Sequence, residues 1–141
     1  MKKFDNFCKA LENLQEIYAY EAPYSNVILT GLVGLYEICF EQSWKAMKES
    51  LYASGIGLAA TGSPKAIIKE AFSNGMIQEE QLWLDALSDQ KHVAHAYNPE
   101  IAGEIVENTK EKYVAMFQEL KTSLEEWQGL TSKAAGTKTS L

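Results

Sequence analysis

Apolar residues of the chain recur at spacings of three and four in five separate segments, which is the pattern of amphipathic helices. The first two segments cover about residues 2–20 and 26–53. Their stripes consist of Phe4, Phe7, Cys8, Leu11, Leu14 and Tyr18, and of Ile28, Leu32, Leu35, Tyr36, Cys39, Phe40, Ser43, Trp44, Met47 and Leu51. A helix over 26–53 is roughly 40 Å long at 1.5 Å per residue, the full length of a helical bundle.

Cap and turn residues delimit the other segments. Ser63-Pro64 and Asn98-Pro99 each combine an N-cap residue with the proline that helices favour at their first position. Asn74-Gly75 is a typical helix end. The expected helices are about 64–74, one from near Gln78 towards the segment with the two histidines, and about 99–127. The last has the stripe Ile101, Ile105, Thr109, Tyr113, Met116, Leu120, Leu124 and Trp127.

These helices predict an all-α protein, an antiparallel up-and-down four-helix bundle with an extra short helix. The segment "LTSKAAGTKTSL" after Gly129 has no periodicity. We therefore expect a single bundle domain over residues 1–128 and a disordered tail over 129–141.

Composition is that of a soluble globular protein, with 46% hydrophobic and 23% charged residues. The longest apolar stretch, "NVILTGLVGLYEICF", is shorter than the roughly 20 residues of a membrane span. The N-terminus has the pattern of an amphipathic helix rather than of a signal peptide. We expect a cytoplasmic protein without a membrane segment, with Cys8 and Cys39 as buried free thiols.

The charge of the chain restricts the kinds of partner that it is expected to bind. The net charge is −6, and every one of the 13 basic residues is a lysine. Arginine is the usual fork for phosphates and for guanine edges, so an acidic chain without arginine is not expected to bind duplex DNA. RNA or a nucleotide at one small site remains compatible with this composition.

The segment "LDALSDQKHVAHAYNPE" holds both histidines of the chain. In a continuous helix, Asp85, Asp89, His92 and His95 would share one face, and this donor set suits a transition metal. An ordinary solvated helix end explains the same spacing. A third interpretation is acid–base chemistry at His95, with Lys91 as the nearest cation for a phosphodiester. The spacing leaves all three open.

Three blocks of the chain resemble one known family. They are "GLYEICFEQSWKAMKESLYASGI", "GSPKAIIKEAFSNGMI" and "WLDALSDQKHVAHAYNPEIAGEI". In this order and spacing they are similar to the HEPN-type nucleotidyltransferase substrate-binding family, over about Phe4 to Leu124. The resemblance implies a helical homodimer without metal or cofactor. It also implies a minimal nucleotidyltransferase encoded nearby as partner, in a two-component or toxin–antitoxin module.

The motif of that family is an arginine, a polar residue, a short spacer, then His-x-Tyr. His95 and Tyr97 match its histidine and tyrosine, while Gln90 replaces the arginine and Lys91 the polar neighbour. Ribonuclease members use the arginine and histidine, and loss of such a charge costs roughly 10²–10³ in rate. In other members the partner modifies the motif tyrosine with a nucleotide, so Tyr97 is the candidate acceptor.

We therefore expect a partner subunit with no independent activity, or only weak activity. It would bind the nucleotidyltransferase and present or bind its substrate or nucleotide. Glu41 and Lys45 are candidates for the same cleft, and their spacing also predicts an ion pair on one helix. The alternatives are a metal-independent ribonuclease that uses His95 with a degenerate motif, and a metal-binding bundle.

Overall fold

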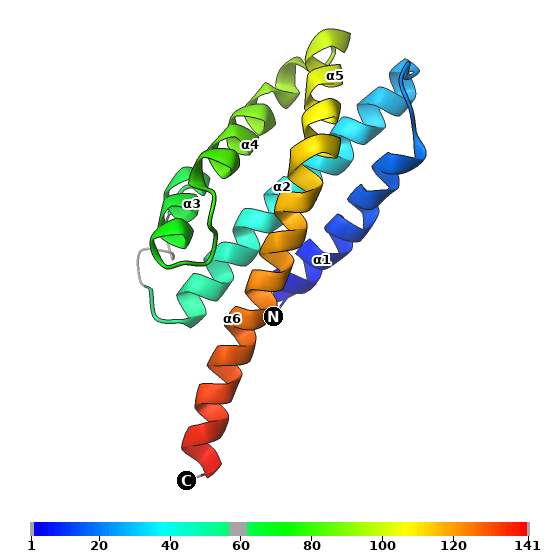
Figure 1. Ribbon diagram of the computed structural model, residues 1–141. Coiled ribbons are helices and arrows are strands. Elements are labelled where there is room, and N and C mark those ends of the chain that lie inside the picture. Colours follow the sequence, from blue (N-terminus) through cyan, green and yellow to red (C-terminus); the bar gives the residue numbers. More distant parts are fainter. Residues whose placement is uncertain (1, 57–61, 141) are drawn as a thin grey trace.

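The computed structural model describes residues 2–56 and 62–140. They form helices and no strand. The helices are α1 (Lys2–Leu14), α2 (Asn26–Ala53), α3 (Pro64–Ser73), α4 (Glu80–His92), α5 (Pro99–Asn108) and α6 (Val114–Ser140), with 3-10 turns at Gln15–Ala19 and Val93–His95 and a π-helical turn at Thr109–Tyr113. Long helices run up and down beside one another, with α3 as the short extra helix (Figure 1). The predicted fold class is confirmed.

N-terminal caps define three helix starts, and the sequence predicted two of them, at Ser63 and Asn98. The Ser25 hydroxyl accepts a hydrogen bond from the Ile28 amide at 3.3 Å, and the Ser63 hydroxyl accepts one from the Ala66 amide at 3.2 Å. The Asn98 side chain caps α5 in the same way. No side-chain cap precedes α4, which begins at Glu80 rather than near Gln78.

The first helix is shorter than its apolar pattern predicted. The chain tightens into a 3-10 turn from Gln15, where three residues complete one turn, so Ile17 follows Leu14 into the core. Tyr18 consequently points outward with 51% of its surface exposed. Its assignment to the buried stripe was wrong, because α-helical spacing no longer applies there.

The predicted long helix over 99–127 contains a π-helical turn that the sequence analysis did not anticipate. Ile101, Ile105, Thr109 and Tyr113 follow one another in steps of four residues. In an α-helix each such step rotates a stripe by roughly 40°, so three in succession would carry Tyr113 off the core face. The wider turn at Thr109–Tyr113 absorbs this drift, and both Thr109 and Tyr113 are buried.

Helix α6 extends farther than its apolar stripe predicted. The stripe indicated an end near Trp127, and the helix continues to Ser140, well past the rest of the bundle (Figure 1). The division into a domain over 1–128 and a tail over 129–141 stays a prediction.

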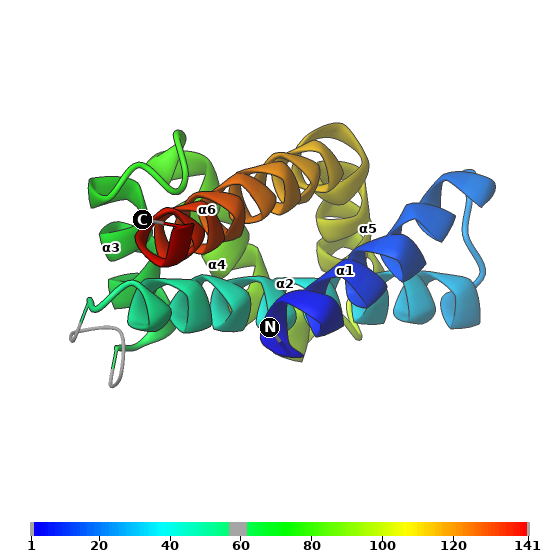
Figure 2. The same cartoon turned by 90° about the horizontal axis from the view of Figure 1, so that it is seen from below.

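Aromatic rings form the centre of the core. The Phe117 ring on α6 lies 5.6 Å from Trp83 of α4, 6.2 Å from Phe7 of α1 and 6.4 Å from Tyr36 of α2, centroid to centroid. Helix α2 runs along one side of the bundle, beneath α4 and α6 in this view (Figure 2). One buried side chain thus joins α1, α2, α4 and α6, and it fixes how α4 lies against α2.

We predict that Phe117→Ala lowers the free energy of unfolding by about 3–5 kcal/mol, because it leaves a cavity where four helices meet. Urea unfolding followed by circular dichroism measures the change. The matched control is Phe72→Ala on α3, whose side chain is 43% exposed and should cost about 0.5 kcal/mol or less. Equal losses in the two variants would contradict this core.

Candidate functional site

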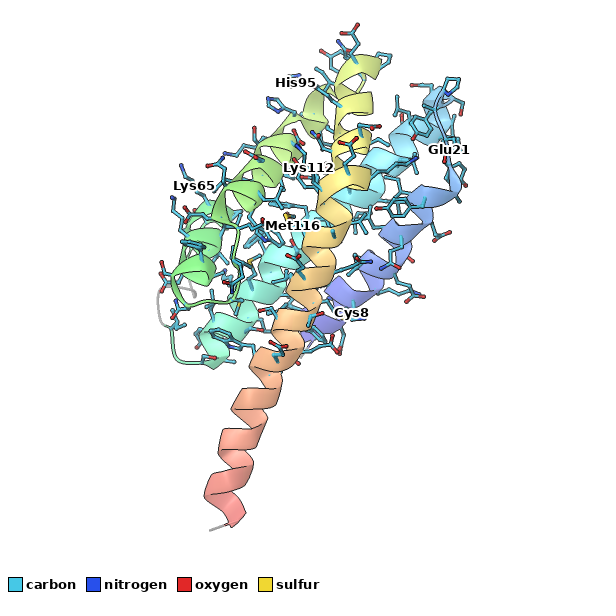
Figure 3. The ribbon with its side chains drawn as sticks, viewed as in Figure 1. Cys8, Glu21, Lys65, His95, Lys112 and Met116 are labelled. Carbon is cyan, nitrogen blue, oxygen red and sulfur yellow. The ribbon has the colours of Figure 1, made fainter. Side chains whose placement is uncertain are left out.

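The histidine segment is not one continuous helix. Helix α4 ends at His92, and Val93–His95 form a 3-10 turn. The His95 carbonyl accepts a hydrogen bond from the Asn98 amide at 3.0 Å, and α5 then begins at Pro99. The predicted face over residues 85–95 is therefore broken after its first two turns. Figure 3 shows His95 at one end of the bundle, just beyond α4.

The four proposed metal ligands separate. Asp89 turns inward, where its carboxylate accepts hydrogen bonds from the Tyr113 hydroxyl at 2.6 Å and the Asn108 amide at 3.0 Å. Asp85 accepts one from Gln81 instead. His92 and His95 are exposed, and no group of three such ligands forms within the described residues. The metal interpretation was wrong because it placed all four side chains on one helical face.

His95 and Tyr97 remain neighbours across the turn. Their rings meet edge to face with centroids 6.4 Å apart, and the Tyr97 side chain is 83% exposed. Gln90 is half-buried and Lys91 is exposed on the last turn of α4. The segment therefore presents a phenol, an imidazole and an ammonium group to solvent at the end of a rigid helix.

Glu41 and Lys45 lie at another level of the bundle. Their predicted ion pair is present, with Oε1 and Nζ 3.2 Å apart, and the other Glu41 oxygen accepts from the Trp44 indole at 3.1 Å. The neighbouring Phe40 packs against Trp83 near the start of α4. His95 lies roughly 18 Å farther along α4 at 1.5 Å per residue. A single protomer does not bring this pair to the histidine turn.

Tyr113 is the residue that sequence reasoning missed. Its ring stacks on Tyr36 with centroids 5.4 Å apart, and the Tyr36 hydroxyl donates to the Ala86 carbonyl. Burial, and then its hydrogen bond to Asp89, raises the Tyr113 pKa above its usual range, so the hydroxyl stays a donor. Because Asp89 directly precedes Gln90, this bond anchors the end of α4.

The π-helical turn that supplies Tyr113 is held from outside the helix. The Lys110 carbonyl accepts a hydrogen bond from the Tyr18 hydroxyl at 2.8 Å. The Lys110 ammonium donates to the Tyr20 carbonyl and lies 5.2 Å from the centre of the Tyr24 ring. The tyrosines between α1 and α2 thus support the π-helical turn. In the sequence, only the apolar spacing in steps of four residues indicated this turn.

Neither cysteine has the surroundings of a catalytic nucleophile. Cys39 is buried as predicted, whereas Cys8 is half-buried beside α6 and not fully enclosed. Burial raises the pKa of both thiols, which keeps them protonated.

We predict that Tyr113→Phe lowers the free energy of unfolding by about 1.5–3 kcal/mol, the typical value of a hydrogen bond to a charged group. It should also shift the NMR signals of Gln90–Tyr97, because Asp89 loses one of its two donors. Tyr97→Phe is the control, since its exposed hydroxyl has no such partner among the described residues and should leave stability unchanged. Identical stabilities for both variants would contradict the anchoring role.

Comparisons with known proteins identify the family of the chain and two solved structures with a similar fold. Residues 2–126 match the family described as "Nucleotidyltransferase substrate binding protein like". The chain belongs to this family. No curated protein matches it significantly. Within the described residues, no helix combines the length and apolarity needed to cross a membrane.

Two solved structures share the fold. A protein from Thermus thermophilus is 28% identical, with a TM-score of 0.74 over 84% of this chain and 98% of its own. A Haemophilus influenzae protein, described as having the fold of a substrate-binding domain of a nucleotidyltransferase, is 19% identical. Its TM-score is 0.75 over 86% of this chain and 98% of its own. Family membership confirms the substrate-binding resemblance, while the HEPN motif assignment stays a prediction.

Proposed function

We propose that the protein is the substrate-binding partner subunit of a separate minimal nucleotidyltransferase and does not transfer nucleotides itself. Family membership supports the association with a nucleotidyltransferase. The observation that carries the proposal is the exposed turn after α4, where Tyr97 is 83% exposed beside His95. A turn held rigidly at its ends and open to solvent between them suits contact with a second protein.

In this proposal Tyr97 is the nucleotide acceptor. Its phenolic oxygen attacks the α-phosphorus of a nucleoside triphosphate held by the partner enzyme. A new oxygen–phosphorus bond forms, the bond to pyrophosphate breaks, and the phenolic proton leaves to solvent or to the neighbouring His95 imidazole. Exposure of the hydroxyl makes the side chain reachable by another protein, and the absent arginine plays no part in this reaction.

A second copy of the chain is the proposed partner of the outer face of α2. Val27 is 79% exposed and Ile38 is 55% exposed on that helix. Gly31 and Gly34 lie between them, and a Cβ added at either would meet no atom within 4 Å. Glycine inside a helix costs about 0.5–1 kcal/mol relative to alanine, and no contact among the described residues of one protomer accounts for this cost. Close approach of a second helix in a homodimer would.

We predict that the chain copurifies with the minimal nucleotidyltransferase encoded beside it. Light scattering should give the complex a molar mass that corresponds to two copies of this chain together with the enzyme. After incubation with nucleoside triphosphates and Mg²⁺, intact-mass spectrometry should show one nucleotidyl group on the wild type and none on Tyr97→Phe. Tyr52→Phe is the matched control, because Tyr52 is also an exposed tyrosine and lies on a different element, α2. Failure to form any complex sinks the proposal, and a modified Tyr97→Phe variant removes Tyr97 as acceptor.

Ribonuclease activity is the alternative that the exposed His95 and Lys91 support. Gln90 cannot neutralise a phosphate, so we predict that RNA incubated with the dimer is cleaved no faster than with His95→Ala. His92→Ala serves as the matched control, because it removes the other exposed histidine from the same segment. Cleavage by the wild type and His92→Ala, but not by His95→Ala, would establish the ribonuclease function instead.

A further inference from the structure

One carboxylate oxygen, Oδ2 of Asp89, accepts hydrogen bonds from both ends of the π-helical turn. Asn108, just before the turn, donates to it at 3.0 Å, and Tyr113, the last residue of the turn, donates at 2.6 Å. In an α-helix, five steps of about 100° would place these two donors roughly 140° apart around the axis. They would then face different neighbours. Their convergence on one oxygen therefore requires the wider turn.

A π-helical turn depends on its surroundings. Hydrogen bonds to the fifth residue along the chain are rare, and they occur mostly as single turns within α-helices, frequently at functional sites. On the inner side, Thr109 and Tyr113 are buried in the core. On the outer side, Lys110 is half-buried and meets the segment between α1 and α2. The contacts of Lys110 thus hold the side of the turn that the core does not reach.

Lys110 uses both its backbone and its side chain for these contacts. Its carbonyl accepts a hydrogen bond from the Tyr18 hydroxyl at 2.8 Å, and its ammonium group donates to the Tyr20 carbonyl. The same ammonium group lies 5.2 Å from the centre of the Tyr24 ring, within cation–π distance. We call Tyr18, Tyr20 and Tyr24 the outer tyrosines. Figure 1 shows α5 and the start of α6 between α4 and the segment that carries the outer tyrosines.

We propose that Lys110 is a positioning residue for the exposed turn with His95 and Tyr97. Its contacts with the outer tyrosines keep residues 109–113 in the π-helical form, and this form brings both donors to Asp89. When the contacts break, the turn relaxes towards α-helical spacing and the donors diverge. Asp89 then loses its fixed place, and the end of α4 loses the orientation from which the exposed turn starts.

The outer tyrosines lie where another molecule can reach them, since the Tyr18 and Tyr20 side chains are 51% and 42% exposed. A contact that pulls them from Lys110 would change the presentation of Tyr97 without touching it. The positioning of the turn is a property of the isolated chain. Only its consequence for nucleotide transfer to Tyr97 rests on the proposed function.

We predict that Lys110→Met shifts the backbone amide NMR signals of Gln90–Tyr97 in the isolated chain, although Lys110 lies on another helix. Lys110→Arg should keep these signals near their wild-type positions, because a guanidinium also donates hydrogen bonds and stacks on tyrosine. Lys112→Met is the matched control, since Lys112 is an exposed lysine of the same turn. Signals around Phe117 should stay in place in all three variants, which separates positioning from a general loss of the fold.

A double variant tests the route of this effect. In Tyr113→Phe, Asp89 has already lost its bond to the last residue of the turn. Adding Lys110→Met should therefore shift the signals of Gln90–Tyr97 much less than it does in the wild type. Three results would overturn the positioning role. They are unchanged signals in Lys110→Met, equal shifts in Lys112→Met, and an undiminished shift in the Tyr113→Phe background.

The consequence for the reaction is measured on the complex with the nucleotidyltransferase. Lys110→Met should lower the rate constant of Tyr97 modification about two- to thirtyfold, the range of couplings between distant residues, and leave the affinity of the two proteins unchanged. Lys110→Arg should restore the rate. Modification of Lys110→Met at the wild-type rate would overturn the positioning of Tyr97. No modification of the wild type would contradict the proposed function alone, because the NMR measurements use the isolated chain.

Discussion

The hydrogen bond from the Tyr113 hydroxyl to the Asp89 carboxylate, 2.6 Å long, holds the end of α4 that leads to the candidate site. It joins the π-helical turn between α5 and α6 to the last turns of α4. Asn108 completes the arrangement at 3.0 Å from the same oxygen. With a carboxylate tied inward at this position, the end of α4 has one fixed orientation, and the exposed turn starts from it.

The aromatic core stabilises the fold, and the residues of the proposed chemistry lie apart from it. Aromatic rings around Phe117 bind α1, α2, α4 and α6 into one core, and no titratable group with a role in the proposed chemistry lies among them. His95 and Tyr97 lie outside this core on a short turn whose two ends are fixed by α4 and by the Asn98 cap of α5. Rigid ends and an open middle allow a second protein to reach the phenol without disturbing the fold.

Absence of arginine shapes every interpretation of the site. Gln90 has hydrogen-bonding groups and no charge, so a phosphate near the motif must find its cation elsewhere.

The sequence by itself determined the approximate positions of the helices, the Ser63 and Asn98 caps, the fold class and the family, because apolar spacing and cap residues act locally. It also predicted the Glu41–Lys45 pair, which needs only one helix. Tertiary structure decided which way Asp89 faces, which residues Lys110 contacts and how far Glu41 is from His95, since each depends on how helices pack. The apparent metal face failed for the same reason. Asp89 finds its hydrogen-bond donors on the helices opposite, and spacing along one segment does not show what lies opposite it.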